Sequence, residues 1–148
     1  MKQLFVEWND QYSVGVQTID EQHKGLFALT NELNDARQEH CTATSECFKE
    51  ILQKAISYIA LHFTTEEKIM QKIDDPDYES HKVAHDLFVK KVMEEEANFN
   101  RGVPNTPEIF MRFLRDWIAD HIICTDIKIG QRIAALKKNG TLKANAEF

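Results

Sequence analysis

Residues 48–70, FKEILQKAISYIALHFTTEEKIM, contain the pattern from which the fold can be predicted. Apolar side chains, together with a histidine and a glutamate, recur there at steps of three and four residues, which is the spacing of one face of an α-helix. Two polar residues, His62 and Glu66, fall on the face that should be buried, where polar groups are costly without a partner. The stretch therefore predicts a long amphipathic helix that carries polar groups into a core. The inner positions are Phe48, Leu52, Ala55, Ile59, His62, Glu66 and Met70.

Helical spacing extends over most of the chain, in which Gly and Pro are scarce. Four long amphipathic helices with short links predict an all-α fold, an antiparallel up-down-up-down four-helix bundle with a short C-terminal helix. We expect one domain over residues 1–148, with an N-terminal arm at 1–17, a polar link at 40–45 and a frayed tail at 139–148. The predicted helices span about 18–38, 46–72, 78–98, 106–122 and 126–138.

Local signals indicate how two of these helices begin. Thr18 and Glu21 have the spacing of a capping box, which predicts that Thr18 caps the first helix. Asp20 either holds the ring of His23 or simply favours the helix dipole. Thr106 precedes a proline at the predicted start of the fourth helix.

Five of the six histidines form a pattern with two acidic residues. His62 and Glu66 are four residues apart, as are His81 and His85, so each pair can direct two donor atoms to one place. Imidazole and carboxylate groups are ligands for transition metals, and seven of them suit two metal ions better than one. The set is His23, His62, Glu66, His81, His85, His121 and Asp126.

His121 and Asp126 do not fit one face of an ideal helix. Five steps of about 100° place them roughly 140° apart. We therefore predict a break near residues 123–125, with Thr125 as a cap for a new helical segment.

Composition excludes several classes of function. The net charge of −6 argues against nucleic acid or an anionic membrane as a partner. No apolar run is long enough for a membrane span, and the N-terminus does not resemble a secretory signal, which favours a cytoplasmic protein. Three widely spaced cysteines, Cys41, Cys47 and Cys124, do not suggest a disulfide framework.

The order H…HxxxE…HxxxH…HxxxxD, preceded by Trp8 and Val14-Gly-Val16, resembles the hemerythrin family in its single-domain bacterial form. The resemblance implies two non-haem iron ions with an oxo or hydroxo bridge and one coordination position left for dioxygen. It implies these ligands: His81, His85 and His121 for one iron, His23 and His62 for the other, and Glu66 and Asp126 as bridges.

The resemblance implies reversible dioxygen binding, for transport, storage or delivery, rather than an enzyme. Two alternatives stay open: an oxygen or redox sensor that acts through a separate protein partner, and a di-iron enzyme that handles peroxide or nitric oxide. A structural zinc site fits seven ligands poorly. Glu67 is expected to be solvated. The residues expected around the open position are Leu26, Phe63, Trp117, Ile118 and Ile122.

Overall fold

The computed structural model describes residues 4–38 and 46–148, and the predicted link at 40–45 lies outside them. Helices are the only regular elements in this part of the chain, which confirms the all-α prediction. Their bounds are Asp10–Tyr12 for the 3-10 turn η1, Gln17–Gln38 for α1, Glu46–Lys72 for α2, Tyr78–Asn100 for α3, Thr106–His121 for α4, Ile122–Asp126 for the π-helical turn η2, and Ile127–Lys138 for α5.

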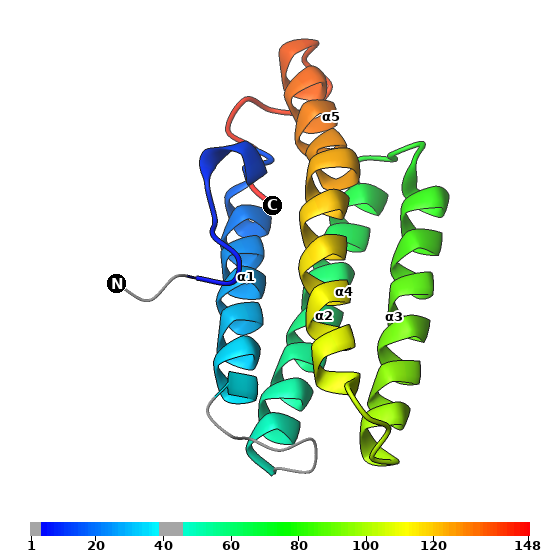
Figure 1. Cartoon of the computed structure of the whole chain (residues 1–148). Helices are drawn as coiled ribbons and strands as arrows, with labels where there is room; N and C mark the ends of the chain where they lie inside the picture. The colour runs from blue at the N-terminus through cyan, green and yellow to red at the C-terminus, as the bar shows by residue number, and fades with distance from the viewer. Residues whose placement is uncertain (1–3, 39–45) are drawn as a thin grey trace.

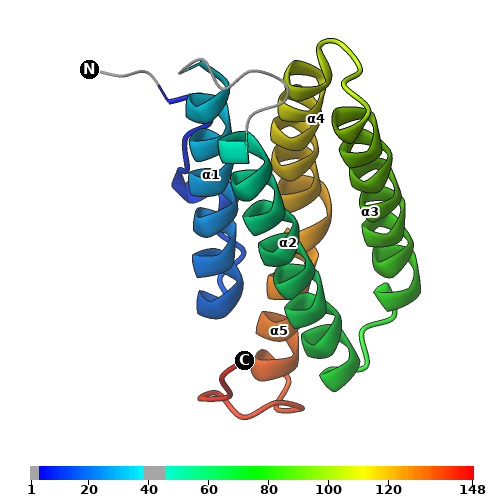
Figure 2. The same ribbon diagram turned by 90° about the horizontal axis from the view of Figure 1, so that it is seen from below.

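Helices α1 to α4 form the predicted antiparallel bundle (Figure 1). Helix α1 packs against α2 and α4, and α3 packs against the same two helices. Successive helices run in opposite directions, so the up-down-up-down topology is confirmed. Helix α5 continues α4 beyond one end of the bundle, and the C-terminus lies near that end (Figure 2). No helix in the described residues is both long enough and apolar enough to cross a membrane.

The inner faces of all five helices contribute to one hydrophobic core. Each large apolar side chain that is removed from water there contributes about 1.5–3 kcal/mol. Burial of the apolar inner face of each helix therefore holds the bundle together. The most completely buried apolar side chains include Ile19, Leu33, Phe48, Met70, Phe88, Leu114 and Ile129.

The start of α1 differs from the predicted capping box. The helix begins at Gln17, and the Asp20 N–H already donates to the carbonyl of Val16. The Thr18 hydroxyl donates instead to the backbone carbonyl of Phe148, at the far end of the chain. The prediction of a Thr18 cap is wrong because the helix already begins at Gln17, so that Thr18 lies inside the first turn and not at the cap position.

Side chains of α1 hold the N-terminal arm. The two oxygens of Asp20 accept hydrogen bonds from the Ser13 hydroxyl and the Val14 N–H, both at 2.7 Å. Farther along α1, the Asn31 amide accepts from the N–H groups of residues 5 and 6 and donates to a carbonyl of the arm. Asp20 is therefore an anchor for the arm and not the histidine partner that the sequence left open.

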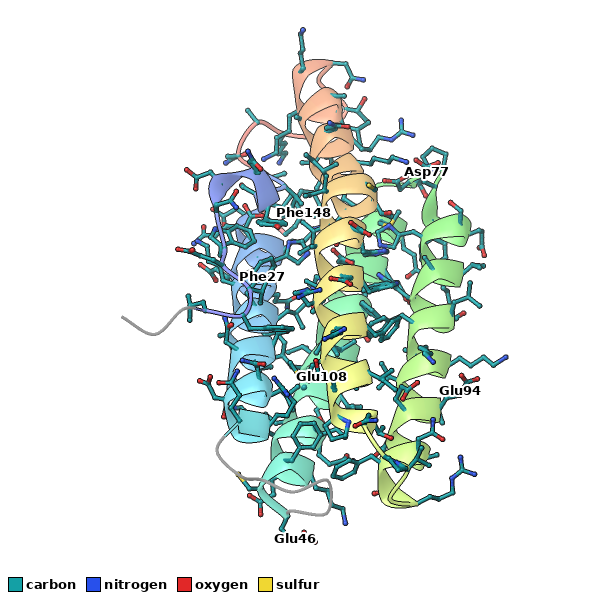
Figure 3. All side chains as sticks on the ribbon, viewed as in Figure 1. Phe27, Glu46, Asp77, Glu94, Glu108 and Phe148 are labelled. Atoms are coloured by element: carbon teal, nitrogen blue, oxygen red, sulfur yellow. The ribbon has the colours of Figure 1, made fainter. Side chains whose placement is uncertain are left out.

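The tail at 139–148, which the sequence predicts to be frayed, lies against the bundle. Leu142 and Phe148 pack against the core, and the Lys72 ammonium lies 4.7 Å from the centre of the Phe148 ring. Figure 3 labels Phe148, which lies near the end of the bundle where α1 begins. These two apolar side chains anchor a segment whose composition is otherwise polar.

The turn η2 lies where the sequence predicts a break. The helix is not interrupted, because the Ile127 N–H donates to the carbonyl of Ile122, five residues earlier. A turn widened in this way brings residues five apart close to one face, so His121 and Asp126 point into the same cluster. The position of the irregularity was predicted correctly, but no side chain caps the start of α5.

Gly130 lets α5 approach the arm closely. A Cβ at this position would overlap the backbone carbonyl of Val14, which cannot move unless the arm moves. Gly25 is a matched helical control, because a Cβ there would meet the end of the flexible Tyr58 side chain instead.

We expect Gly130→Ala to lower the free energy of unfolding by about 1–3 kcal/mol, as overpacking usually does. Gly25→Ala should cost less, because alanine favours a helix over glycine by about 0.5–1 kcal/mol and Tyr58 can turn away. Denaturant unfolding of the two variants measures both effects. Equal losses would show that the contact between arm and α5 is not the limiting constraint.

Candidate metal centre

The seven predicted ligand residues meet in the interior of the bundle. Helix α1 supplies one, α2 and α3 supply two each, and the segment from the end of α4 through η2 supplies two. All are buried, and the most exposed, His121, keeps only 7% of its surface. Their donor atoms form two groups that share both carboxylates. The first group is Glu66, His81, His85, His121 and Asp126, and the second is His23, His62, Glu66 and Asp126.

Three histidines form one side of the cluster. Their Nε2 atoms lie 3.1 Å apart for His81 and His85, 3.2 Å for His85 and His121, and 3.4 Å for His81 and His121. Hydrogen bonds cannot satisfy all three sides of this triangle, because each Nε2 atom carries at most one hydrogen or one lone pair to share. Nitrogens bound at about 2.1 Å to one metal ion, at right angles, are roughly 3 Å apart. The triangle therefore fits a shared cation.

Two histidines form the other side. The Nε2 atom of His23 lies 3.2 Å from Asp126 Oδ2 and 3.6 Å from Glu66 Oε1. The Nε2 atom of His62 lies 3.5 Å from the same Glu66 oxygen. The donor atoms of this group lie within 4.8 Å of one another, as they do in the first group. This side offers the same carboxylates but one imidazole fewer.

Each carboxylate turns one oxygen toward each side. Glu66 Oε2 lies 3.2 Å from His85 Nε2, on the side opposite to the histidines that Oε1 approaches. Asp126 Oδ1 lies 2.9 Å from His121 Nε2, whereas Oδ2 faces His23. Two carboxylates arranged in this way can bridge two cations.

The cluster is not satisfied by hydrogen bonds. No oxygen of Glu66 or Asp126, nor Nε2 of His23, has a hydrogen-bond partner among the described residues. Both carboxylates are fully buried, and a buried charge without compensation costs several kcal/mol. Two cations placed between the groups would remove this cost, so the residues present fit a pair of metal ions.

Without a cation the cluster retains protons. Burial alone lowers the pKa values of His23 and His81, but Asp126 and Glu66 outweigh burial and raise both to about 9. Burial would raise the pKa values of the two carboxyls, yet the surrounding histidines hold both below the usual range. Burial lowers the pKa of His62 to about 4, so this ring is neutral near pH 7. Metal ions would therefore replace protons on His23 and His81.

Two residues outside the predicted set contact the outer nitrogens of ligand histidines. His85 Nδ1 lies 3.1 Å from Glu67 Oε1, and His62 Nδ1 lies 3.1 Å from Gln22 Oε1. The prediction that Glu67 is solvated is only partly correct: 21% of the side chain is exposed, but α3 packs beside α2 and brings His85 against one carboxylate oxygen. A signal existed, since metal-binding histidines usually donate their second N–H to a carboxylate or carbonyl.

Aromatic rings cover the three-histidine side. The Phe63 ring stacks on His85 with centres 3.7 Å apart and planes at 5°, and Trp117 stacks on His121 at 4.1 Å. Leu26, Ile118 and Ile122, the other residues expected around the open position, are buried. That all five surround such a position remains a prediction.

Metal uptake at neutral pH should release protons. His23 and His81, with pKa values of about 9, are protonated near pH 7 in the metal-free chain, and a protonated imidazole cannot bind a metal ion. The apparent affinity for Fe²⁺ should therefore rise from about pH 7 to about pH 9 and then level off. Calorimetry in buffers of different ionisation enthalpy counts the protons. Absence of release at neutral pH would contradict this assignment.

Comparisons with known proteins agree with the geometry. The family described as the hemerythrin HHE cation binding domain matches residues 14–129. A hemerythrin-like protein of Naegleria gruberi is 31% identical over 82% of this chain and 87% of its own length. A bacteriohemerythrin of Methylococcus capsulatus is 30% identical over 84% of this chain and 93% of its own. A crystal structure of wild-type hemerythrin matches with a TM-score of 0.79 at 29% identity, over 88% of this chain and 98% of that one. With a family match across most of its length and the cation-binding cluster at its centre, the chain belongs to the hemerythrin family.

Proposed function

We propose that this chain binds two non-haem iron ions with an oxo or hydroxo bridge and that the pair binds dioxygen reversibly. Support comes from the family match and from the two groups of donors that share their carboxylates. The proposed ligands are His81, His85 and His121 for the first iron, His23 and His62 for the second, and Glu66 and Asp126 for both.

The different number of histidines in the two groups is the observation that best supports the proposal. On the three-histidine side, three nitrogens and one oxygen from each carboxylate give five donors, and the proposed bridging oxygen would be the sixth. The two-histidine side has one nitrogen fewer, so one position there is left for a ligand from outside. When bound, the iron pair supplies two electrons and this position to dioxygen.

The protein around the cluster favours binding over further reaction. Five neutral imidazole ligands donate less negative charge to the irons than the glutamates of ferritin-like di-iron proteins do. Such ligands suit an iron pair that gives two electrons to dioxygen and no more. Leu26, Ile118 and Ile122 are buried apolar side chains that exclude water and offer no proton. Phe63 and Trp117 fix imidazole planes by stacking. These residues keep the ligands in place and the site dry.

The protein should contain about two irons per chain and change its visible absorption reversibly between reduced, oxygen-free solution and air. His62→Ala should abolish the reversible change because the second iron loses one of its two nitrogens. His40→Ala, at the one histidine outside the cluster and outside the described residues, is the control. One iron per chain would contradict the proposal, and rapid turnover of peroxide or nitric oxide would indicate an enzyme instead.

Leu26 lies one helical turn after His23, and its removal should expose the second iron to water. We expect Leu26→Ala to keep both irons but to lose the oxygenated absorption faster than the parent. A buried Leu→Ala change costs about 2–5 kcal/mol anywhere in a core. The control is Leu52→Ala, which is equally buried and ten residues before His62 on α2. Equal decay in the two variants would assign the effect to general loosening.

A further inference from the structure

The outer partners of the two groups differ in charge. His85, of the three-histidine group, has the Glu67 carboxylate at its Nδ1, whereas His62, of the two-histidine group, has the Gln22 amide. Both contacts are 3.1 Å long, and both histidines turn Nε2 toward the cluster. The geometry is therefore matched, and the difference is one full negative charge.

The orientation of Gln22 is fixed by a short chain of hydrogen bonds. The Thr65 hydroxyl donates to the carbonyl of Leu61, so its oxygen can only accept from Gln22 Nε2, at 3.0 Å. Gln22 Oε1 must then face His62, which places the imidazole hydrogen on Nδ1 and leaves the Nε2 lone pair for a cation. Gln22 thus selects the ligating tautomer of His62 without adding charge.

Glu67 selects the same tautomer of His85 and adds charge. A carboxylate can only accept, so His85 Nδ1 must donate to it and Nε2 keeps its lone pair. The side chain is 21% exposed, and its other oxygen lies 3.9 Å from the Lys82 ammonium, a contact too long and too exposed to neutralise it. A hydrogen bond to a charged acceptor is stronger than one to a neutral amide and makes the imidazole a stronger electron donor.

We propose that Glu67 is a positioning residue that, through His85, makes the first iron harder to reduce than the second. The neutral Gln22 adds no negative charge behind His62, a ligand of the second iron. When dithionite supplies one electron to the pair of ferric ions, the second iron becomes ferrous and the first remains ferric. The iron with the open position is then the one that changes first. This inference rests on the proposed di-iron site and adds an order of reduction that the ligand set alone does not specify.

Three variants separate charge from orientation. Glu67→Gln keeps the shape and an acceptor oxygen but removes the charge, and Gln22→Glu adds the charge on the other side. The pair Gln22→Glu with Glu67→Gln exchanges the two partners. Glu50→Gln is a matched control, because it removes the same charge from an exposed position on the same helix.

The measurements are a reductive titration with dithionite, followed by visible absorption and by the electron paramagnetic resonance of the one-electron-reduced form, and the rate of iron loss to a chelator. We expect Glu67→Gln to raise the potential of the step that reduces the first iron and to weaken its retention by about 10–100-fold. The exchanged pair should give a different paramagnetic spectrum, because the ferric ion changes side. Glu50→Gln should match the parent in every measurement.

Parent-like potentials and iron retention in Glu67→Gln would overturn the inference, since its charge would then be irrelevant. An unchanged paramagnetic spectrum in the exchanged pair would do the same. A parent protein that fails to bind two irons would instead contradict the proposed function, so the two failures are distinguishable.

Discussion

Two buried carboxylates set the conditions that the rest of the bundle has to meet. Glu66 and Asp126 are fully buried, and their oxygens have no hydrogen-bond partner among the described residues. Positive charge must come from cations or from protonated histidines, and every helix of the bundle contributes at least one imidazole around them. A helix that slid or rotated would take a ligand out of reach. Neutralising two buried charges therefore fixes the register of all four helices.

The two sides of the cluster share the same carboxylates but differ in the number of their histidines and in the charge behind them. Both carboxylates face both sides, yet one side has three imidazoles and the other two. The outer hydrogen bonds repeat the inequality, with a carboxylate behind His85 and an amide behind His62. The inner difference leaves one side with fewer ligands, and the outer difference places a full negative charge behind a histidine of the other side. Two chemically similar positions can thus perform different tasks within one small core.

Sequence patterns predict features that depend on one helix at a time. Periodic apolar positions predicted the helices to within about two residues, and the spacing within pairs such as His81 and His85 brought their donors to one face. Which residues of distant segments meet was not predictable, even where a histidine was expected to have some carboxylate or carbonyl partner. The Thr18 hydroxyl donates to the last residue of the chain, and Glu67 contacts His85 of a helix whose packing angle no local pattern contains. The five-residue step to Asp126 revealed an irregularity but not its π-helical form.

The turn η2 amounts to one residue inserted into an otherwise continuous α-helix. Without that residue everything downstream would rotate by about 100°. The face of α5 that carries Gly130 would then turn away from Val14, and a bulkier side chain would meet the arm. The insertion that delivers a carboxylate to the cluster also determines which side of α5 the arm can dock on. Deletion of this residue would therefore disturb both the ligand cluster and the contact between α5 and the arm.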